Sequence, residues 1–330
     1  MNESFILTRS QKNKTPLVEV RNLKKYFKLN FKESIYAVDD VSFSIEKGET
    51  VGIVGESGCG KTTLGRSILN LYKPTSGQVI FDGKDLSLAS KKEAHAIKKR
   101  MQIILQDPYA SFNPRMTISQ IICEGMDAHK IFKTKHEKQE AVYFLLQTVG
   151  LAPEHANRFP HEFSGGQRQR IGIARALAVN PDFIVCDEPI SSLDVSIQAQ
   201  IINLLTRLQR EFNMTYLFIA HDLSVVKYIS NKVGVMYLGK IIEFADSNSL
   251  YKNPLHPYSQ ALISAIPSTD LDDPMMKRRI HLNGEISNAI NPPTGCRFYK
   301  RCPMAKDICK SAYPELKETC KGHFVACHLI

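Results

Sequence analysis

The sequence predicts an α/β fold with a largely parallel sheet, because two patterns alternate along the chain. Its 43% hydrophobic and 23% charged residues over 330 positions are typical of a globular protein and exclude a disordered or fibrous class. Apolar residues with helical spacing lie at residues 62–72 and 195–212. Short apolar runs bounded by turn residues predict buried strands at residues 50–54, 182–188, 215–221 and 233–239.

Other segments refine this architecture. Residues 41–45 alternate apolar with polar side chains and predict a half-buried strand, and residues 78–83 and 101–106 are further strand candidates. Residues 108–163 show helical spacing without a strand pattern, which predicts a helical insertion. A short helix is expected to end at Pro267, and the polar, proline-rich sequence after it predicts linkers and loops.

Lys and Arg exceed Asp and Glu by ten, a balance that suits nucleic acid, an anionic membrane surface or phosphorylated ligands. The excess is uneven, since residues 277–330 hold ten Lys and Arg against four Asp and Glu. No run approaches about 18 consecutive apolar residues. Residues 1–16 lack the apolar core of a signal peptide. We therefore expect a cytosolic chain without a membrane span.

A glycine-rich turn follows the first buried strand and matches the P-loop pattern G-x-x-x-x-G-K-[ST]. Backbone N–H groups of such a turn bind phosphate oxygens, helped by the positive end of the following helix. Lys61 is expected to reach the terminal phosphates, and Thr62 to offer a hydroxyl to Mg²⁺. The predicted nucleotide-binding residues are Gly55, Glu56, Ser57, Gly58, Cys59, Gly60, Lys61, Thr62 and Thr63.

Two further motifs point to phosphate chemistry. The strand at residues 182–188 ends in Asp187 and Glu188. An aspartate so placed holds Mg²⁺ in P-loop enzymes, and the adjacent glutamate can orient or deprotonate the attacking water. Residues 163–170, FSGGQRQR, form a second Ser/Gly-rich turn before a helix and hence a second anion site, predicted to serve the nucleotide of another copy. Alone, this turn would indicate only a helix N-cap.

The motifs GESGCGKT, FSGGQRQR, VCDEP and SSLD occur in this order, with Gln106 and His221 at matching places, and together resemble the nucleotide-binding subunits of ABC transporters. The resemblance covers about residues 17–267. It implies a P-loop NTPase cassette with a helical subdomain at about 108–163, in which ATP and Mg²⁺ lie between two subunits. The resemblance implies that Thr62 and Asp187 bind Mg²⁺, that Gln106 contacts Mg²⁺ and senses the membrane partner, that Glu188 is catalytic and that His221 contacts the γ-phosphate. It implies that Ser164, Gly165, Gly166 and Gln167 form the signature turn, which acts in trans, and that Asp194 belongs to the D-loop. Phe27 would stack on the adenine, with Tyr26 as the alternative.

The last stretch of the chain is rich in cysteine. In a cytosolic protein such crowding favours metal over disulfides. The spacing is not C-x2-C, so a zinc or iron–sulfur site and reduced structural thiols both stay open. The cysteines are Cys296, Cys302, Cys309, Cys320 and Cys327.

Residues 268–330, with LNGEI, NPPTGCRFYKRCP and HFVAC, resemble the small cysteine-rich C-terminal extension of ATPase subunits from oligopeptide and dipeptide importers, the F-type subunit more than the D-type. Some members of that group carry a [4Fe–4S] cluster in this extension. The implied ligands are Cys296, Cys302, Cys309 and Cys327, with Cys320 spare or competing for the last place. The cluster's negative charge would then be partly balanced by Arg297, Lys300 and Arg301.

The resemblance implies an ATPase that couples ATP hydrolysis to peptide import, attached peripherally to the cytoplasmic face of a bacterial cell membrane. Its expected partners are two transmembrane permeases, a second homologous ATPase subunit and, indirectly, an extracellular peptide-binding protein, with no nucleic acid. Another cargo, such as a nickel chelate or glutathione, stays open. A soluble ABC ATPase acting on nucleic acid or ribosomes is disfavoured by the single cassette and the lack of sustained heptads.

Overall fold

The computed structural model describes residues 16–266, 280, 282 and 289–330. The boundary predicted between residues 267 and 268 and the segment LNGEI therefore lie at least partly outside the described residues. The chain divides into two compact units. The first consists of Glu46–Glu49 and Leu88–Leu217, and the second of Leu17–Ile45, Thr50–Ser87 and Phe218–Ile330.

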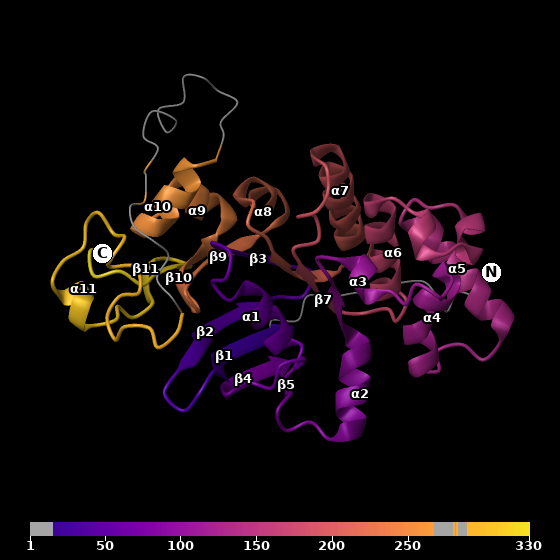
Figure 1. Cartoon of the computed structure of the whole chain (residues 1–330), viewed down its shortest axis with the longest axis horizontal. Helices are drawn as coiled ribbons and strands as arrows, with labels where there is room; N and C mark the ends of the chain where they lie inside the picture. Colours follow the sequence, from indigo (N-terminus) through magenta and orange to yellow (C-terminus); the bar gives the residue numbers. More distant parts are fainter. Residues whose placement is uncertain (1–15, 267–279, 281, 283–288) are drawn as a thin grey trace. The chain divides into compact units, whose positions relative to one another are not determined.

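One sheet of the second unit is antiparallel, with the strand order β2-β1-β4-β5 (Figure 1). The segment predicted as a half-buried strand is the end of β2, where Val41, Phe43 and Ile45 are all buried. Alternation therefore found the buried face but only half of the strand. The bounds are β1 Val18–Lys28, β2 Ser34–Ile45, β4 Ser76–Phe81 and β5 Lys84–Asp85.

The second sheet of this unit is mixed. Strand β9 pairs parallel with β3 and antiparallel with β10, and β12 joins β10 to β11 by antiparallel pairing. All five residues of β3 are buried, as its continuous apolar run predicts. The strands are β3 Thr50–Val54, β9 Lys232–Tyr237, β10 Lys240–Asp246, β11 Lys317–Cys320 and β12 His323–Val325. The helices are α1 Lys61–Ile68, α8 Leu223–Ile229, α9 Ser247–Lys252, α10 Pro257–Ser264 and α11 Ile308–Ser311.

The first unit combines a parallel strand pair with helices. Strands β6 and β7 run parallel, in a register that places Ile104 beside Cys186. Capping boxes at Thr117 and Thr134 begin α4 and α5, since each hydroxyl accepts the N–H three residues on. The elements are α2 Lys91–Arg100, β6 Met101–Ile104, α3 Pro108–Ser111, α4 Ile118–Ala128, α5 Lys135–Thr148, the 3-10 helices η2 Pro153–Asn157 and η3 Pro160–Glu162, α6 Gly165–Leu177, β7 Phe183–Asp187 and α7 Val195–Phe212, followed by β8 Thr215–Ile219, which runs on into the second unit.

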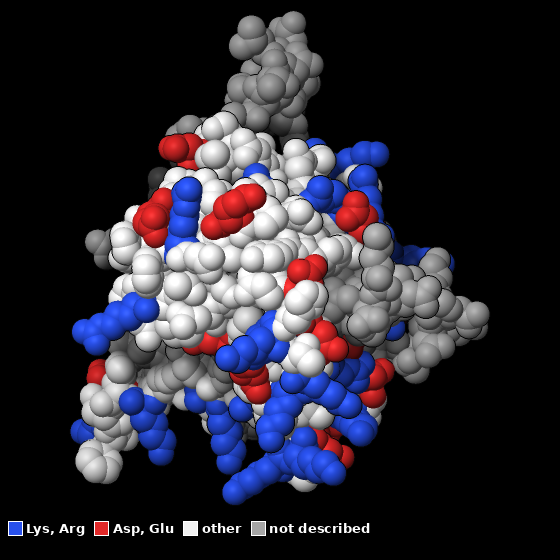
Figure 2. Space-filling view, turned by 90° about the vertical axis from the view of Figure 1, so that its right-hand side faces the viewer, with Lys and Arg blue, Asp and Glu red and all other residues white. Residues whose placement is uncertain are grey.

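Two surface properties bear on function. No helix in the described ranges is long and apolar enough to cross a bilayer. Basic side chains are not confined to the C-terminal extension, because Figure 2 shows many Lys and Arg on one face, with Asp and Glu between them. Helix α2, which lies outside the extension, carries Lys91, Lys92, Lys98, Lys99 and Arg100.

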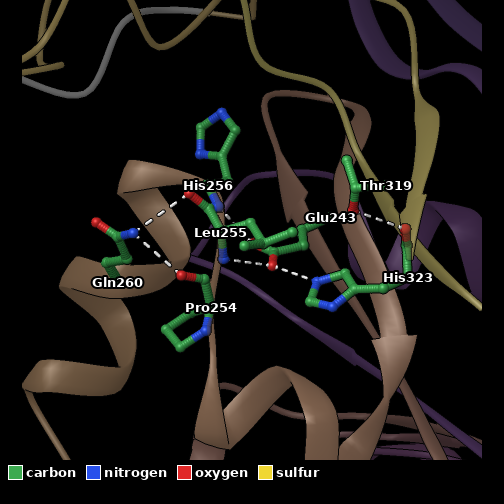
Figure 3. A network of polar contacts seen from close by, with 7 residues as sticks. All are labelled: Glu243, Pro254, Leu255, His256, Gln260, Thr319 and His323. Carbon is green, nitrogen blue, oxygen red and sulfur yellow. Dashed lines mark hydrogen bonds and ion pairs between the residues drawn. The ribbon is translucent and has the colours of Figure 1, made fainter. Parts of the chain in front are cut away.

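A buried carboxylate attaches the end of the chain to the second unit (Figure 3). Glu243 of β10 has no exposed surface and accepts the N–H groups of Leu255, at 2.7 Å, and His256, at 2.9 Å. Nε2 of His323, on β12, lies 2.7 Å from the Glu243 Oε1. No strand was predicted at β12, because a strand of three residues is too short to show a sequence period.

Replacing Glu243 by Gln should lower the free energy of unfolding by about 3 kcal/mol, because a buried network then loses one acceptor and the charge that holds His323. Denaturant unfolding of the full chain measures this. Glu315→Gln, an exposed site in the same extension, is the matched control and should change stability by less than about 0.5 kcal/mol. Equal stability of the two variants would contradict this account.

Candidate nucleotide-binding site

The predicted P-loop lies between β3 and α1 and depends on glycine at two positions. Gly55 has φ 152° and Gly60 has φ 109°, values that side-chain-bearing residues rarely adopt. A Cβ on Gly60 would lie 1.9 Å from the carbonyl oxygen of Ala37, and one on Gly55 2.2 Å from that of Met236. Backbone therefore packs directly on backbone, which fixes the path of the loop.

Lys61 begins α1 and is 4% exposed. Its Nζ donates to the carbonyl oxygens of Gly55, at 2.8 Å, and Glu56, at 3.0 Å, so the ammonium group is held inside the loop. Cys59 is buried in the same loop, and burial raises the pKa of its thiol. The helix N-terminus and Lys61 supply the positive potential that a phosphate needs.

Glu56 is fixed by residues from distant parts of the second unit, which the sequence analysis missed. Both of its carboxylate oxygens accept from Arg301, at 2.7 Å and 3.0 Å. Its N–H donates to the hydroxyl oxygen of Tyr258, at 3.0 Å. Arg301 belongs to the C-terminal extension, so the extension contacts the P-loop.

The extension's arginines do not have the role that was predicted for them. Arg297 is 5% exposed, pairs with Asp39 and donates to the carbonyl oxygen of Leu238. Arg301 pairs with Glu56. Buried cations need such partners, so both guanidinium groups balance carboxylates of the second unit instead of a cluster. Lys300 is exposed.

The two aromatic candidates for adenine stacking have different surroundings. The Tyr26 hydroxyl donates to Asp39 at 2.5 Å, and its ring lies 4.2 Å from that of Tyr36. Phe27 meets Tyr72 edge-on at 5.6 Å, with the Lys25 ammonium 4.8 Å from its ring. Both rings contact neighbours, but only Tyr26 is also held by a hydrogen bond, to Asp39, which favours Phe27 for a ligand.

His221, the predicted γ-phosphate contact, lies exposed in the turn between β8 and α8. Asp222 caps α8 by accepting the N–H of Ser224 at 2.8 Å. The helix start therefore fixes the backbone beside the histidine.

In the first unit, the parallel register of β6 and β7 brings Gln106 and Glu188 together. Each follows the carboxyl end of its strand, and these ends share one edge of the pair. Gln106 Nε2 donates to Glu188 Oε2 at 3.0 Å. Gln106 and Glu188, which two separate motifs predicted as functional residues, are thus hydrogen-bonded to each other.

Glu188 has φ 48°, in the left-handed region that costs a non-glycine residue free energy. Its carbonyl oxygen accepts from the Ser191 N–H at 3.3 Å and from the Ser191 hydroxyl at 3.2 Å. Asp187, one residue earlier, is 2% exposed at the end of β7. One such carboxylate suits Mg²⁺, which usually takes one or two carboxylates, with water and phosphate as its other ligands.

The signature turn begins α6. Ser164 is the N-cap, and its N–H donates to Gln167 Oε1 at 3.0 Å in a capping box. A Cβ on Gly166 would lie 2.5 Å from a methyl group of Ile197, so close packing on α7 requires glycine there. Gly165 is exposed beside it. The predicted N-cap of α7, Asp194, occupies that place but makes no side-chain capping bond.

The predicted iron–sulfur site finds no support in the cysteine geometry. All five cysteines of the extension are described, and no three His, Cys, Asp or Glu side chains in the described ranges form a group that could hold a metal ion. Burial, with smaller contributions from the neighbouring thiols Cys309, Cys327 and Cys302, raises the pKa of Cys296 to about 11. Burial also raises the pKa of Cys302 and Cys327.

Family comparisons match both parts of the chain. The ABC transporter family matches residues 38–191, and the family described as the oligopeptide/dipeptide transporter C-terminal region matches residues 242–309. Among solved structures, the ATP-binding cassette MJ0796, as a dimer bound to ADP and Pi, covers 70% of this chain and 98% of its own, with 29% identity and a TM-score of 0.64. CbiO1 from Clostridium perfringens covers 72% and 91%, with 25% identity and a TM-score of 0.63. The predicted P-loop cassette fold is confirmed.

Two curated relatives match almost end to end. The oligopeptide transport ATP-binding protein AppF of Bacillus subtilis is 55% identical over 96% of this chain and 98% of its own. A putative peptide import ATP-binding protein of Brucella ovis is 54% identical over 95% and 98%. The chain therefore belongs, as its motifs predicted, to the oligopeptide transport ATP-binding proteins of the ABC transporter family.

Proposed function

We propose that this chain hydrolyses ATP as the energy-coupling subunit of an ABC importer for oligopeptides or dipeptides. The observation that carries the proposal is the 55% identity to AppF over 96% of the chain, because it includes the C-terminal extension as well as the cassette. The described residues retain the groups that the chemistry needs: a buried P-loop lysine, a buried aspartate and a glutamate held by Gln106.

Phosphoryl transfer to water needs charge neutralisation and an aligned nucleophile. Lys61 and the N-terminus of α1 would bind the phosphates, Phe27 would stack on the adenine and His221 would contact the γ-phosphate. Glu188 would orient the attacking water and accept its proton. Mg²⁺, held by Thr62, Asp187 and Gln106, would neutralise phosphate charge.

The proposed partners follow from the same family. Ser164, Gly165, Gly166 and Gln167, at an exposed helix N-terminus, would contact nucleotide bound to a second, homologous ATPase subunit, with Asp194 nearby in the D-loop. Two permeases would anchor the pair peripherally at the cytoplasmic face, and an extracellular binding protein would deliver the peptide. Co-purification with multi-span permeases tests this proposal, whereas salt-sensitive nucleic-acid binding without a membrane partner would reject it.

Glu188→Gln should retain ATP binding and lose turnover by about 100-fold or more, because the amide cannot accept a proton. Phosphate release and ATP affinity are measured separately on the full chain. Glu140→Gln, an exposed site on α5, is the control and should keep wild-type turnover. Near-normal hydrolysis by Glu188→Gln would remove Glu188 from this role.

Two P-loop glycines give a matched pair of variants. Gly60→Ala should abolish measurable ATP binding, because its Cβ meets the Ala37 carbonyl at 1.9 Å and backbone must move. Gly58→Ala has no atom within 4 Å of its Cβ. Only its left-handed backbone opposes the change, by roughly 1–2 kcal/mol, so it should keep ATP affinity within about tenfold. Calorimetric ATP titrations compare the two, and equal losses would contradict the steric argument.

The [4Fe–4S] cluster on Cys296, Cys302, Cys309 and Cys327 remains a prediction of the family resemblance alone. Protein purified without oxygen should then be brown, with absorbance near 400 nm and about four irons per chain. Cys309→Ser should remove colour and iron, while Cys320→Ser, the control, should keep both. A colourless, iron-free wild-type chain would reject the cluster.

A further inference from the structure

The P-loop contains a carboxylate, that of Glu56, whose negative charge opposes phosphate binding. Glu56 is the second residue of the loop, and its carbonyl oxygen accepts from the P-loop lysine at 3.0 Å. A carboxylate at this place repels the phosphates of a nucleotide, and the repulsion is strong where surrounding protein displaces water. Burial chiefly raises the pKa of the Cys59 thiol inside the loop, and the Glu56 charge adds to that rise.

Arg301 meets this carboxylate in the geometry that neutralises it best. Two guanidinium N–H groups each donate to a different oxygen of Glu56, at 2.7 Å and 3.0 Å, which makes the pair bidentate. The Arg301 side chain is 7% exposed and that of Glu56 23%, so solvent screens the pair only weakly. The hydrogen bonds that Arg301 donates to Glu56 raise the pKa of the guanidinium above its usual value, which keeps it charged.

The extension holds Arg301 in place before any ligand arrives. The backbone N–H of Arg301 donates to the carbonyl oxygen of Phe298 at 3.0 Å. Phe298 is 1% exposed and packs edge-on against Tyr237, at 5.3 Å, and Tyr258, at 5.4 Å. Tyr258 in turn accepts the Glu56 N–H. The same buried aromatic group thus positions both the arginine and the backbone of the acidic loop residue.

We propose that Arg301 is a positioning residue for the nucleotide site: it neutralises and fixes Glu56, so that the P-loop can accept a triphosphate. The C-terminal extension thereby completes the ATP-binding loop, from 245 positions further along the chain. This inference rests on the proposed ATPase function. It assigns Arg301 no contact with ATP itself.

The alternative is that Arg301 only staples the extension to the cassette. The two roles differ in their dependence on ligand charge. A neutralising role makes the loss of affinity grow from adenosine, which has no phosphate, through ADP to ATP. If Arg301 were only a staple, its removal would distort the loop and weaken the binding of ATP and ADP equally. Removing the Glu56 charge would then not restore the affinity.

The test measures the affinities of ATP, ADP and adenosine by calorimetry on the full chain. Arg301→Ala should weaken ATP binding about five- to tenfold, ADP less and adenosine not at all. Glu56→Gln should bind ATP more tightly than the wild type, because Arg301 is then unpaired beside the phosphates. The double variant should return to within about twofold of the wild type, and Arg301→Lys should fall between the wild type and Arg301→Ala. Lys310→Ala removes the same charge from an exposed pair with Asp307 and serves as the control.

Wild-type ATP affinity in Arg301→Ala would overturn the inference, as would a loss that Glu56→Gln does not repair. A wild-type chain that neither binds nor hydrolyses ATP would instead reject the proposed function. A lower melting temperature of Arg301→Ala combined with unchanged ATP affinity would show a staple alone and also overturns the inference.

Discussion

The dominant constraint on this chain is electrostatic, because its proposed chemistry places carboxylates near a ligand that is itself strongly negative. Glu56 and Glu188 each have a side-chain partner within their own unit. Glu56 is paired with Arg301, and Glu188 accepts from Gln106 at 3.0 Å. The difference in partner is meaningful. Under the proposed chemistry, the arginine would cancel the charge of Glu56, whereas the amide would orient Glu188 and leave its charge available to accept a proton.

The nucleotide motifs were predictable because each is contiguous in the sequence. A buried strand, a glycine turn and a helix start produce the P-loop within residues 50–68, and β7 ends at the predicted acidic pair. The contact between Gln106 and Glu188 also follows once β6 and β7 are taken as parallel neighbours. Local pattern suffices where backbone hydrogen bonds within one or two elements decide the geometry.

The rest depends on contacts that no local pattern encodes. Arg301 meets Glu56 across 245 positions, and Arg297 meets Asp39 across 258. Strand β12 has only three residues and is stabilised by antiparallel pairing with β10. The contact between His323 and Glu243 adds to this pairing. The crowded cysteines are likewise not decided by local pattern. Their spacing leaves a metal site and reduced thiols both open, because coordination depends on where the thiols point and on whether they are deprotonated.

These contacts explain why the extension belongs to the second unit and is not an independent module. It contributes a strand to that unit's sheet, a histidine to a buried glutamate and two arginines to carboxylates of the cassette. Truncation before the extension would therefore leave Glu243, Asp39 and Glu56 without these partners, two of them in a buried environment where an unpaired charge is costly. The basic excess near the C-terminus is in part the complement of acidic residues placed early in the chain. A segment that looks like an appendage in the sequence thus supplies the partners of carboxylates in the rest of the second unit.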